Sequence, residues 1–311
     1  MKIIITGALG HIGSSLIRYL AKIKKFETIY LIDNFSAQRY CSLFNLPEDA
    51  SYTFLDLNLA DCKIESIPDS DCIIHLAAKT DAAQSSKYEK EFYNNNLEAT
   101  KKIIAYSKNK YSKLIFASST SIYGPQSDLI DENCLDKELK PQTPYADIKL
   151  KEEKIISETL NTKHSFIILR LGTIYGFSPG MRFHTAINKF CLQACMKKPL
   201  TVWRTAWEQK RPYLSLNDFN RAIEHIIHNN LFRNSIYNVL SHNKKVKEII
   251  EIINKKIPSN IEYVDHPIMN QLSYEISNKK FCDTDFKFIS NLKDDVFEIL
   301  DTMININTSK I

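Results

Sequence analysis

Glycine is scarce in this chain of 311 residues, which contains only seven glycines, where an average usage of about 7% would give about 20. The seven fall into three places: Gly7, Gly10 and Gly13, then Gly124, then Gly172, Gly176 and Gly180. A chain so poor in glycine is expected to keep it where the backbone needs positive φ or a close approach to another group. These three places are therefore the first candidates for chemistry.

Long apolar runs and paired cysteines are also missing. No apolar run approaches the about 18–20 residues of a membrane-spanning helix, and the apolar residues 3–5 lead at once into glycines, so neither an anchor nor a signal peptide is expected. The seven cysteines are an odd number at irregular spacings, which predicts free thiols and a cytoplasmic location. Cys191 and Cys195 are one helical turn apart but lack a second pair, so no metal site is predicted.

Blocks of like charge are absent as well. The 41 Lys and Arg exceed the 36 Asp and Glu by five, and the excess is spread along the chain. This balance suits an anionic small molecule but lacks the clustered basic face of a nucleic-acid-binding protein. The length allows one large domain or two modest ones.

Strand and helix patterns alternate in the first half of the chain. Apolar runs such as Ile3-Ile4-Ile5 are typical of strands covered on both faces of a parallel sheet. The predicted strands are 2–6, 28–32, 52–55, 72–76, 113–118 and 165–170, and the predicted helices between them are 11–24, 89–109 and 145–159. This alternation predicts a doubly wound α/β sheet.

After Gly176 the alternation loosens. Helices are predicted at 183–195, 217–229, 246–256 and 294–304, a strand at 235–239, and irregular structure rich in Pro, Asn and aromatics over 257–287. We therefore expect a cofactor-binding domain over 1–176 and a smaller α+β lobe over 177–311, with some of its segments returning to the first sheet.

The segment Thr6-Gly-Ala-Leu-Gly-His-Ile-Gly13 follows a predicted strand and opens a predicted helix. Its glycines permit a tight turn, close approach to a pyrophosphate and close helix–strand packing, while the helix N-terminus offers free N–H groups to phosphates. The alternative is an ordinary turn that caps a helix. The strand–turn–helix context favours dinucleotide binding.

Asp33 supports that interpretation. It closes the second strand about 20 residues after the last glycine, where a carboxylate can accept hydrogen bonds from both ribose hydroxyls. A 2′-phosphate there would meet a like charge, so NAD is favoured over NADP, although the nearby Arg39 softens the preference. Asp56, which ends the third strand, is placed either for the adenine amino group or as a helix N-cap.

Tyr145 and Lys149 are four residues apart, on one face of a predicted helix. A free tyrosine, with a pKa of about 10, is a poor base at neutral pH, but a nearby ammonium and a positive nicotinamide ring stabilise the phenolate. Ser118-Ser-Thr-Ser121 stands at the carboxyl end of the fifth strand, where open α/β sheets bind ligands. One of these hydroxyls can hold a substrate alcohol against the tyrosine, and others only cap the strand end.

Together these residues resemble the extended short-chain dehydrogenase/reductase family of nucleotide-sugar epimerases and dehydratases. The resemblance covers nearly the whole chain and includes His75-Leu-Ala-Ala78, Asn96-Leu-Glu-Ala-Thr100 and the segment 170–176. It implies a Rossmann-type fold, NAD as the cofactor, Ser119 and Tyr145 as catalytic residues, and Lys149 as the electrostatic partner of the tyrosine. The cofactor-binding residues that it implies are Gly7, Leu9, Gly10, His11, Ile12, Gly13, Asp33, Asn34, Asp56, Leu57, Leu76, Ala77, Ala78, Thr80, Asn96, Ser118, Tyr145 and Lys149.

The same resemblance implies a nucleotide-diphosphate sugar as substrate. The segments 199–203 and 211–218 resemble the family's nucleotide-sugar segment, in which an arginine binds the diphosphate; a surface arginine beside a proline is the alternative for Arg211. The implied substrate-binding residues are Thr80, Ser119, Thr120, Tyr145, Thr173, Trp203 and Arg211.

The departures from the family pattern bear on the reaction. Family dehydratases carry an Asp-Glu pair just after the catalytic hydroxyl, whereas this chain has Thr120 and Ser121, which cannot act as general acid and base near pH 7. Thr173 stands where many relatives place an asparagine, and Arg204 replaces a usual glycine. Elimination is therefore disfavoured, and the substrate cannot be copied from a familiar member.

We predict an NAD-dependent nucleotide-sugar epimerase that acts at C4 through a transient 4-keto sugar, with Tyr145 as base. The alternatives are a 4-dehydrogenase that releases the keto-sugar, a 4,6-dehydratase, and a non-catalytic NAD-binding protein. The resemblance also implies a homodimer paired through helices 89–109 and 145–159, although burial within one protomer explains their apolar positions equally well: Leu97, Ile103, Ile104, Ile148, Ile155 and Ile156. The nucleotide, the sugar and the inverted carbon stay open.

Overall fold

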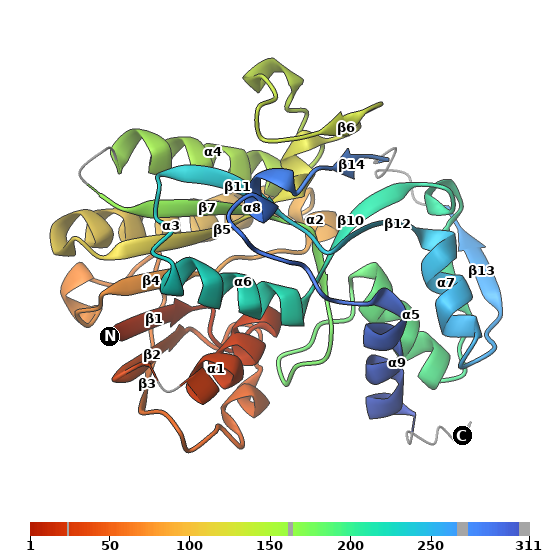
Figure 1. Cartoon of the computed structure of the whole chain (residues 1–311), viewed down its shortest axis with the longest axis horizontal. Coiled ribbons are helices and arrows are strands. Elements are labelled where there is room, and N and C mark those ends of the chain that lie inside the picture. Colours follow the sequence, from red (N-terminus) through yellow and green to blue (C-terminus); the bar gives the residue numbers. More distant parts are fainter. Residues whose placement is uncertain (24, 161–163, 266–272, 305–311) are drawn as a thin grey trace.

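A computed structural model describes residues 1–23, 25–160, 164–265 and 273–304. Seven parallel strands form its main sheet in the order β11-β7-β5-β4-β1-β2-β3, and they follow one another down the left half of Figure 1. Their bounds are β1 (Lys2–Thr6), β2 (Thr28–Asp33), β3 (Tyr52–Asp56), β4 (Cys72–His75), β5 (Lys113–Ser119), β7 (Phe166–Leu171) and β11 (Ser235–Val239). The predicted Rossmann-type fold is confirmed.

Helices cover both faces of this sheet because its strands are apolar on both sides. Ile3 and Ile5 of β1 pack in one cluster with α1 (His11–Ile23) and α6 (Leu216–His228), whereas Ile4 packs in another with α3 (Glu89–Lys110) and α4 (Pro144–Thr159). Burying both faces explains the continuous apolar strand that the sequence shows. The strand order reverses between β1 and β4, and open α/β sheets bind their ligands at such a point.

A second lobe lies to the right in Figure 1. Its apolar core includes Phe190, Ile249 and Val296. Its helices are α5 (Ala186–Cys195), α7 (Val246–Asn254) and α9 (Leu292–Met303); its strands are β8 (Thr173–Tyr175), β9 (Leu200–Trp203), β10 (Lys210–Ser215), β12 (His242–Lys245) and β13 (Ile261–Val264). Strand β10 pairs with β8 and β12, and β9 pairs with β13. The lobe therefore has a core of its own beside the end of the main sheet.

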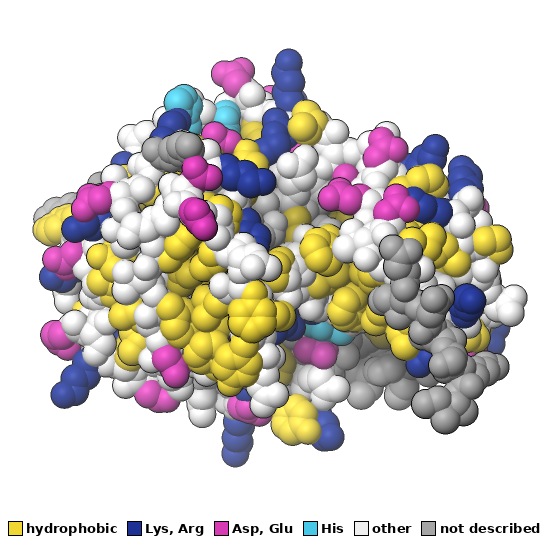
Figure 2. Space-filling view, turned by 90° about the horizontal axis from the view of Figure 1, so that it is seen from below, with side chains coloured by type: hydrophobic (Ala, Val, Ile, Leu, Met, Phe, Trp, Pro, Cys, Tyr) yellow, Lys and Arg dark blue, Asp and Glu magenta, His cyan; other side chains and the backbone are white. Residues whose placement is uncertain are grey.

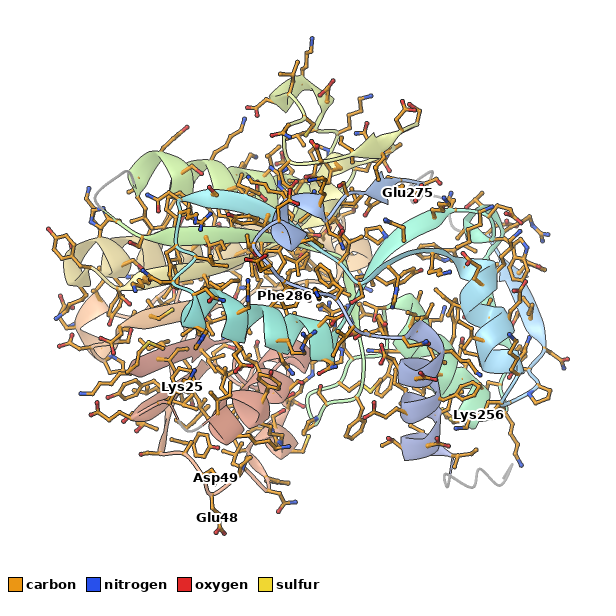
Figure 3. All side chains as sticks on the ribbon, in the orientation of Figure 1. Lys25, Glu48, Asp49, Lys256, Glu275 and Phe286 are labelled. Atoms are coloured by element: carbon orange, nitrogen blue, oxygen red, sulfur yellow. The ribbon has the colours of Figure 1, made fainter. Side chains whose placement is uncertain are left out.

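Short elements complete the described part of the chain: α2 (Ala82–Ser85), α8 (Lys279–Cys282), β6 (Leu129–Ile130) and β14 (Glu275–Ile276). From β14, where Glu275 pairs with Lys210 of β10 at 2.9 Å, the chain runs back over α6 (Figure 3). Phe286 lies beside α6 there and packs in the same cluster as Ile3. Strand β11 pairs in parallel with β7 at the edge of the main sheet.

The predicted strands of the first half agree with the structure to within a residue at each end. The helix predicted over 183–195 begins at Ala186 instead, because the residues before it form a loop that packs into the cleft described below. Residue 24, at the predicted end of the first helix, and residues 266–272, within the predicted irregular segment, lie outside the described residues. None of the helices in the described ranges is long and apolar enough to cross a membrane.

The seven cysteines are free, as predicted. Cys72, Cys191 and Cys195 are buried, whereas Cys41 is exposed. Burial raises the pKa of the Cys72 thiol to about 12, which makes it an inert apolar side chain.

Candidate active site

The glycine turn joins β1 to α1 at the carboxyl end of the sheet. Gly7 has φ of +64°, and a Cβ on it would lie 2.7 Å from the backbone nitrogen of Ala77. A Cβ on Gly13 would lie 2.5 Å from the carbonyl oxygen of Gly7. Gly10 differs, because the nearest atom to its Cβ would be the Gly7 oxygen at 3.2 Å. Two glycines thus permit close packing, and the third keeps the side that faces the cleft open.

Asp33 ends β2 next to this turn. Its Oδ2 accepts from the N–H of Leu9 at 3.0 Å, and its Oδ1 accepts from the N–H of Phe35 at 3.1 Å. Burial raises the pKa of Asp33, and these N–H groups and the Arg39 charge oppose that shift. The carboxylate is therefore held in one orientation beside the cleft, which it lines together with Asn34 and Arg39.

Ser119 is the last residue of β5 and caps the short 3-10 helix Thr120–Tyr123. Its Oγ accepts from the N–H of Ser121 at 3.2 Å and lies 2.9 Å from the Ser121 hydroxyl. Thr120 donates its hydroxyl to the carbonyl oxygen of Leu171 at 3.2 Å. Of the two residues after Ser119, only Ser121 is thus hydrogen-bonded to it.

Tyr145 stands in the first turn of α4, whose start is well defined by the sequence. Thr143 caps the helix by accepting from the N–H of Ala146 at 3.2 Å, and Pro144 occupies the first helical position. Lys149 follows one turn later and is 3% exposed. Tyr145, Lys149 and Ser119 line the same cleft.

Most of the predicted site residues meet in this cleft, which lies between the two lobes. Seen from below, Lys, Arg and His atoms are visible between the lobes, and hydrophobic side chains gather on the left half of that face (Figure 2). The predicted residues that line the cleft are Gly7, Leu9, Gly10, His11, Ile12, Gly13, Asp33, Asn34, Leu57, Leu76, Ala77, Ala78, Thr80, Ser118, Ser119, Thr120, Tyr145, Lys149, Thr173, Trp203 and Arg211.

The structure places two predicted cofactor residues elsewhere. Asp56 is exposed at the end of the edge strand β3 and does not line the cleft; its neighbour Leu57 does. Asn96 is fully buried, where its Oδ1 accepts from the N–H of Lys79 at 2.8 Å and its Nδ2 donates to the Lys79 carbonyl at 3.0 Å. The amide of Asn96 thus holds the loop after Ala78.

His11 lines the cleft, but its ring is bonded within the protein. Its Nδ1 lies 2.8 Å from the Ser178 hydroxyl, and its Nε2 lies 3.2 Å from the amide nitrogen of Asn188. Burial and the nearby Arg182 lower the pKa of His11 to about 3, so the ring is neutral. A Cβ on Gly180 would lie 2.3 Å from the Leu9 carbonyl oxygen. The segment 176–185 is thus fastened directly onto the glycine turn.

That segment also brings in an arginine that sequence reasoning missed. Arg182 is partly buried and donates to the Thr80 hydroxyl, and Tyr145 and Asp81 are among the groups whose charges act on it. It lies in a loop without hydrophobic periodicity, so no sequence pattern marked it. His184, two residues on, is exposed and also lines the cleft, where desolvation by its surroundings and the Arg182 charge lower its pKa to about 4.

Four buried polar atoms in the cleft lining have no hydrogen-bond partner within the described part of the chain. All four residues line the cleft, and the atoms are Arg182 Nε, Thr185 Oγ1, Arg211 Nε and Tyr213 Oη. Buried polar groups are normally satisfied, and a guanidinium N–H can only donate. Lys189, whose pKa burial lowers, lines the cleft too. This wall is built to receive hydrogen-bond acceptors, and its cations favour an anionic ligand.

Residues 3–239 match the NAD dependent epimerase/dehydratase family. The chain belongs to this family. Among its relatives, an uncharacterized UDP-glucose epimerase of Bacillus subtilis (strain 168) is 30% identical over 73% of this chain and 72% of its own length. A dTDP-D-glucose 4,6-dehydratase of Dictyostelium discoideum is 30% identical over 81% of this chain and 62% of its own length.

Solved structures agree on the fold. The UDP-glucuronic acid 4-epimerase from Bacillus cereus, in complex with UDP-glucuronic acid and NAD, superimposes with a TM-score of 0.88 and 22% identity over 97% of this chain and 99% of that one. The family is NAD-dependent, and the cleft fits NAD on two observations. Gly10 leaves the turn open where a pyrophosphate would approach, and Asp33 presents an oriented carboxylate.

Proposed function

We propose that this chain is an NAD-dependent nucleotide-sugar epimerase that inverts C4 through a transient 4-keto sugar. One observation carries the proposal: Ser119, Tyr145 and Lys149 line the same cleft as the glycine turn, and the opposite wall carries guanidinium N–H groups without protein partners. Proton transfer needs the first set of residues, and an anionic substrate needs the second. Family membership and the named relatives support the same reaction class.

Each side chain has a defined task in this proposal. Tyr145 removes the proton of the 4-hydroxyl and later returns it, and Ser119 orients that hydroxyl by hydrogen bonding. Lys149 supplies the positive charge that stabilises the phenolate. NAD supplies the hydride acceptor for C4 and afterwards the hydride donor. The keto-sugar must turn over within the cleft between the two transfers, so that its other face meets the cofactor.

Residues 1–176 bind the dinucleotide in this proposal, and the later part of the chain binds the nucleotide sugar. Arg211 and Lys189 hold the diphosphate, since cations with buried donors suit phosphate oxygens. Thr173 and Trp203 line the sugar or base pocket. The UDP-glucose epimerase among the relatives makes UDP-sugars the first substrates to test.

A 4-dehydrogenase that releases the keto-sugar would use the same residues and is the second candidate. A dehydratase is disfavoured because Thr120 and Ser121 supply no carboxyl group, and the Thr120 hydroxyl is bonded to the Leu171 carbonyl. A non-catalytic sensor would have no use for Tyr145 as a base. The epimerase proposal needs Tyr145 as a base and needs no carboxyl group at Thr120 or Ser121.

We also propose a cytoplasmic homodimer, by analogy with the family. The apolar side chains that the sequence offers for a dimer interface, such as Leu97, Ile103 and Ile156, are buried inside the protomer. Pairing through α3 and α4 would therefore use their exposed residues, such as Tyr93 and Lys101. Sedimentation equilibrium tests this, and a monomer at all concentrations would contradict it.

The reaction is tested by incubating the pure protein with UDP-, GDP-, CDP- and dTDP-sugars in turn. Sugar stereochemistry is followed by NMR and reduced nicotinamide by its absorbance. Inversion at C4 without accumulation of reduced cofactor supports the epimerase. Stoichiometric reduced cofactor instead assigns the dehydrogenase, and no turnover of any sugar contradicts both.

Tyr145→Phe tests the base. We expect turnover to fall by at least about 100-fold, because a phenyl ring cannot transfer a proton, while NAD binding, measured by fluorescence titration, is retained. Tyr111→Phe is the matched control, since Tyr111 is 73% exposed at the end of α3 and lies away from the cleft lining. Turnover that survives in Tyr145→Phe would contradict the mechanism.

A further inference from the structure

The ammonium of Lys149 has a carboxylate partner that the mechanism above does not use. Its Nζ lies 3.0 Å from Oε2 of Glu152, three residues along α4, and 4.5 Å from the centroid of the Phe116 ring. The side chains of Lys149 and Glu152 are 4% and 1% exposed. Glu152 is therefore a buried carboxylate in direct contact with the cation assigned to stabilise the tyrosine.

The other oxygen of Glu152 ends a chain of buried hydrogen bonds. The hydroxyl of Thr100 donates to Glu152 Oε1 at 2.5 Å, and His75 Nε2 lies 3.2 Å from that hydroxyl. His75 Nδ1 lies 2.7 Å from the Thr6 hydroxyl, whose oxygen accepts from the N–H groups of Leu76 and Ala77. The chain thus runs from Glu152 through α3 and β4 to the end of β1.

One set of proton positions satisfies this chain. Thr6 accepts two N–H groups and so donates its own proton to His75 Nδ1, which leaves Nε2–H to donate to Thr100, and Thr100 to donate to Glu152. Burial and the Lys149 charge lower the pKa of His75 to about 3, in agreement with a neutral ring. Oε1 of Glu152 is then the acceptor at the end of this chain.

We propose that Glu152 is a positioning residue that fixes the Lys149 ammonium in the cleft and offsets part of its positive charge at Tyr145, and thereby sets the pH range of activity. This inference rests on the proposed function. A buried ion pair with one partner removed leaves an uncompensated charge, so Glu152 governs how much positive charge Tyr145 meets. The next residue, Glu153, is also buried but pairs with Arg170 at 2.8 Å.

The charged and titratable groups around this pair come from several elements. His75 of β4 is neutral, and Phe116 of β5 contributes only its ring face. Arg182, from the loop before α5, interacts with Tyr145 and with Asp81. None of these groups contributes a carboxylate in direct contact with Lys149, so a change at Glu152 has no such substitute.

The test compares Glu152→Gln with Glu152→Asp in the full chain with NAD. For Glu152→Gln we expect the acidic limb of the pH profile of kcat/KM to move to lower pH by about one unit, because the Lys149 charge then acts on Tyr145 without an opposing carboxylate. Glu152→Asp keeps the negative charge but moves it away from Lys149, because its side chain is shorter. We therefore expect kcat to fall several-fold, while the acidic limb of the pH profile and the KM of the sugar do not change.

A second measurement does not depend on turnover. The ultraviolet tyrosinate signal that Tyr145→Phe removes is titrated in the unmodified protein and in Glu152→Gln, and it moves to lower pH in the variant. The matched control is Glu158→Gln, an exposed position at the far end of α4, which moves neither measurement.

If Glu152→Gln folds and neither the acidic limb of its kcat/KM profile nor the pH of its tyrosinate signal changes, the inference is overturned. The proposed epimerase function would not be affected. Absent turnover in the unmodified protein would defeat the proposed function alone, and the tyrosinate titration would still decide the role of Glu152. If Glu152→Gln does not fold, Glu152→Asp decides, and an unchanged kcat there overturns the inference.

Discussion

Charge at single residues governs what the cleft accepts. Asp33 and Arg39 lie close enough that the Arg39 charge opposes the rise in the pKa of Asp33. The carboxylate is also bonded to the N–H groups of Leu9 and Phe35, so it cannot turn away from an incoming ribose. A dinucleotide with a 2′-phosphate would bring a second negative charge to this position.

Asp33→Ser is expected to raise the affinity for NADP relative to NAD by about tenfold or more, since it removes like-charge repulsion and leaves Arg39 available to the phosphate. Fluorescence titration with both cofactors measures the ratio. Glu48→Ser is the control, because Glu48 is exposed at the bottom of the first lobe, away from the cleft lining (Figure 3). An unchanged ratio in Asp33→Ser would show that another group selects the cofactor.

Two segments distant in the chain form one element at the mouth of the cofactor site. The glycine turn and the loop 176–185 are in backbone contact at Gly180, whose N–H donates to Ser14 Oγ at 2.9 Å. His11 adds a second attachment through Ser178 and Asn188. The second lobe is thereby fixed to the glycine turn.

Gly10→Ala and Gly180→Ala distinguish two roles of glycine here: room for a ligand at Gly10 and close backbone packing at Gly180. A methyl group at Gly10 would meet only the Gly7 carbonyl oxygen, at 3.2 Å, and Gly10 lines the cleft, so we expect NAD affinity to fall at least about tenfold while the free energy of unfolding changes by less than about 1 kcal/mol. At Gly180 it would meet the Leu9 carbonyl at 2.3 Å, so we expect destabilisation by about 1–3 kcal/mol. Calorimetric titration and urea unfolding measure these effects. If Gly10→Ala binds NAD as tightly as the unmodified protein, the prediction that the pyrophosphate binds at this turn is wrong.

Across the whole molecule, stability is tied to pH through buried neutral histidines. Burial lowers the pKa of His75 and of His11 to about 3, from an ordinary value of 6.5. As the pH falls below 6.5, the unfolded chain takes up protons at both residues and the folded protein does not. The free energy of unfolding therefore falls with pH until about 3, at up to about 1.4 kcal/mol per pH unit for each ring.

His75→Gln keeps one donor and one acceptor but cannot take up a proton in this range. Between pH 6.5 and pH 5, we expect the unmodified protein to lose about 1.6 kcal/mol more stability than this variant, measured by urea unfolding at both values. His228→Gln, at an exposed position of α6, should lose as much as the unmodified protein. Equal losses in the unmodified protein and His75→Gln would contradict the assignment.

Local patterns predicted the main sheet because the buried residues of its strands and helices recur at regular positions in the sequence. Apolar runs predicted β1, β2, β4 and β5 to within a residue, and the helix predicted from residue 145 begins at Pro144. The predicted glycine turn, Asp33, Ser119, Tyr145 and Lys149 meet in one cleft, since they stand at strand ends or on a helix of known phase. Their roles stay predictions until the variants are made.

Arg182 and Glu152 show where such reasoning stops. Arg182 lies in an irregular loop, and Glu152 reads from the sequence as an ordinary surface glutamate of a helix. Asn96, on a helix facing the cleft, was predicted to contact the cofactor, yet its amide binds the Lys79 backbone. Neither the partner of a buried polar group nor the path of a loop is encoded in local periodicity.

By itself, the sequence determined the doubly wound sheet, the glycine turn and the tyrosine–lysine helix, because burial periodicity and backbone requirements act over a few neighbouring residues. The tertiary structure decided which polar groups meet: Glu152 with Lys149, Arg182 near Tyr145, and His11 with Ser178. Two of these contacts join residues from separate elements. The third, Glu152 with Lys149, depends on which face of α4 is buried. Only the packing of the whole chain settles them.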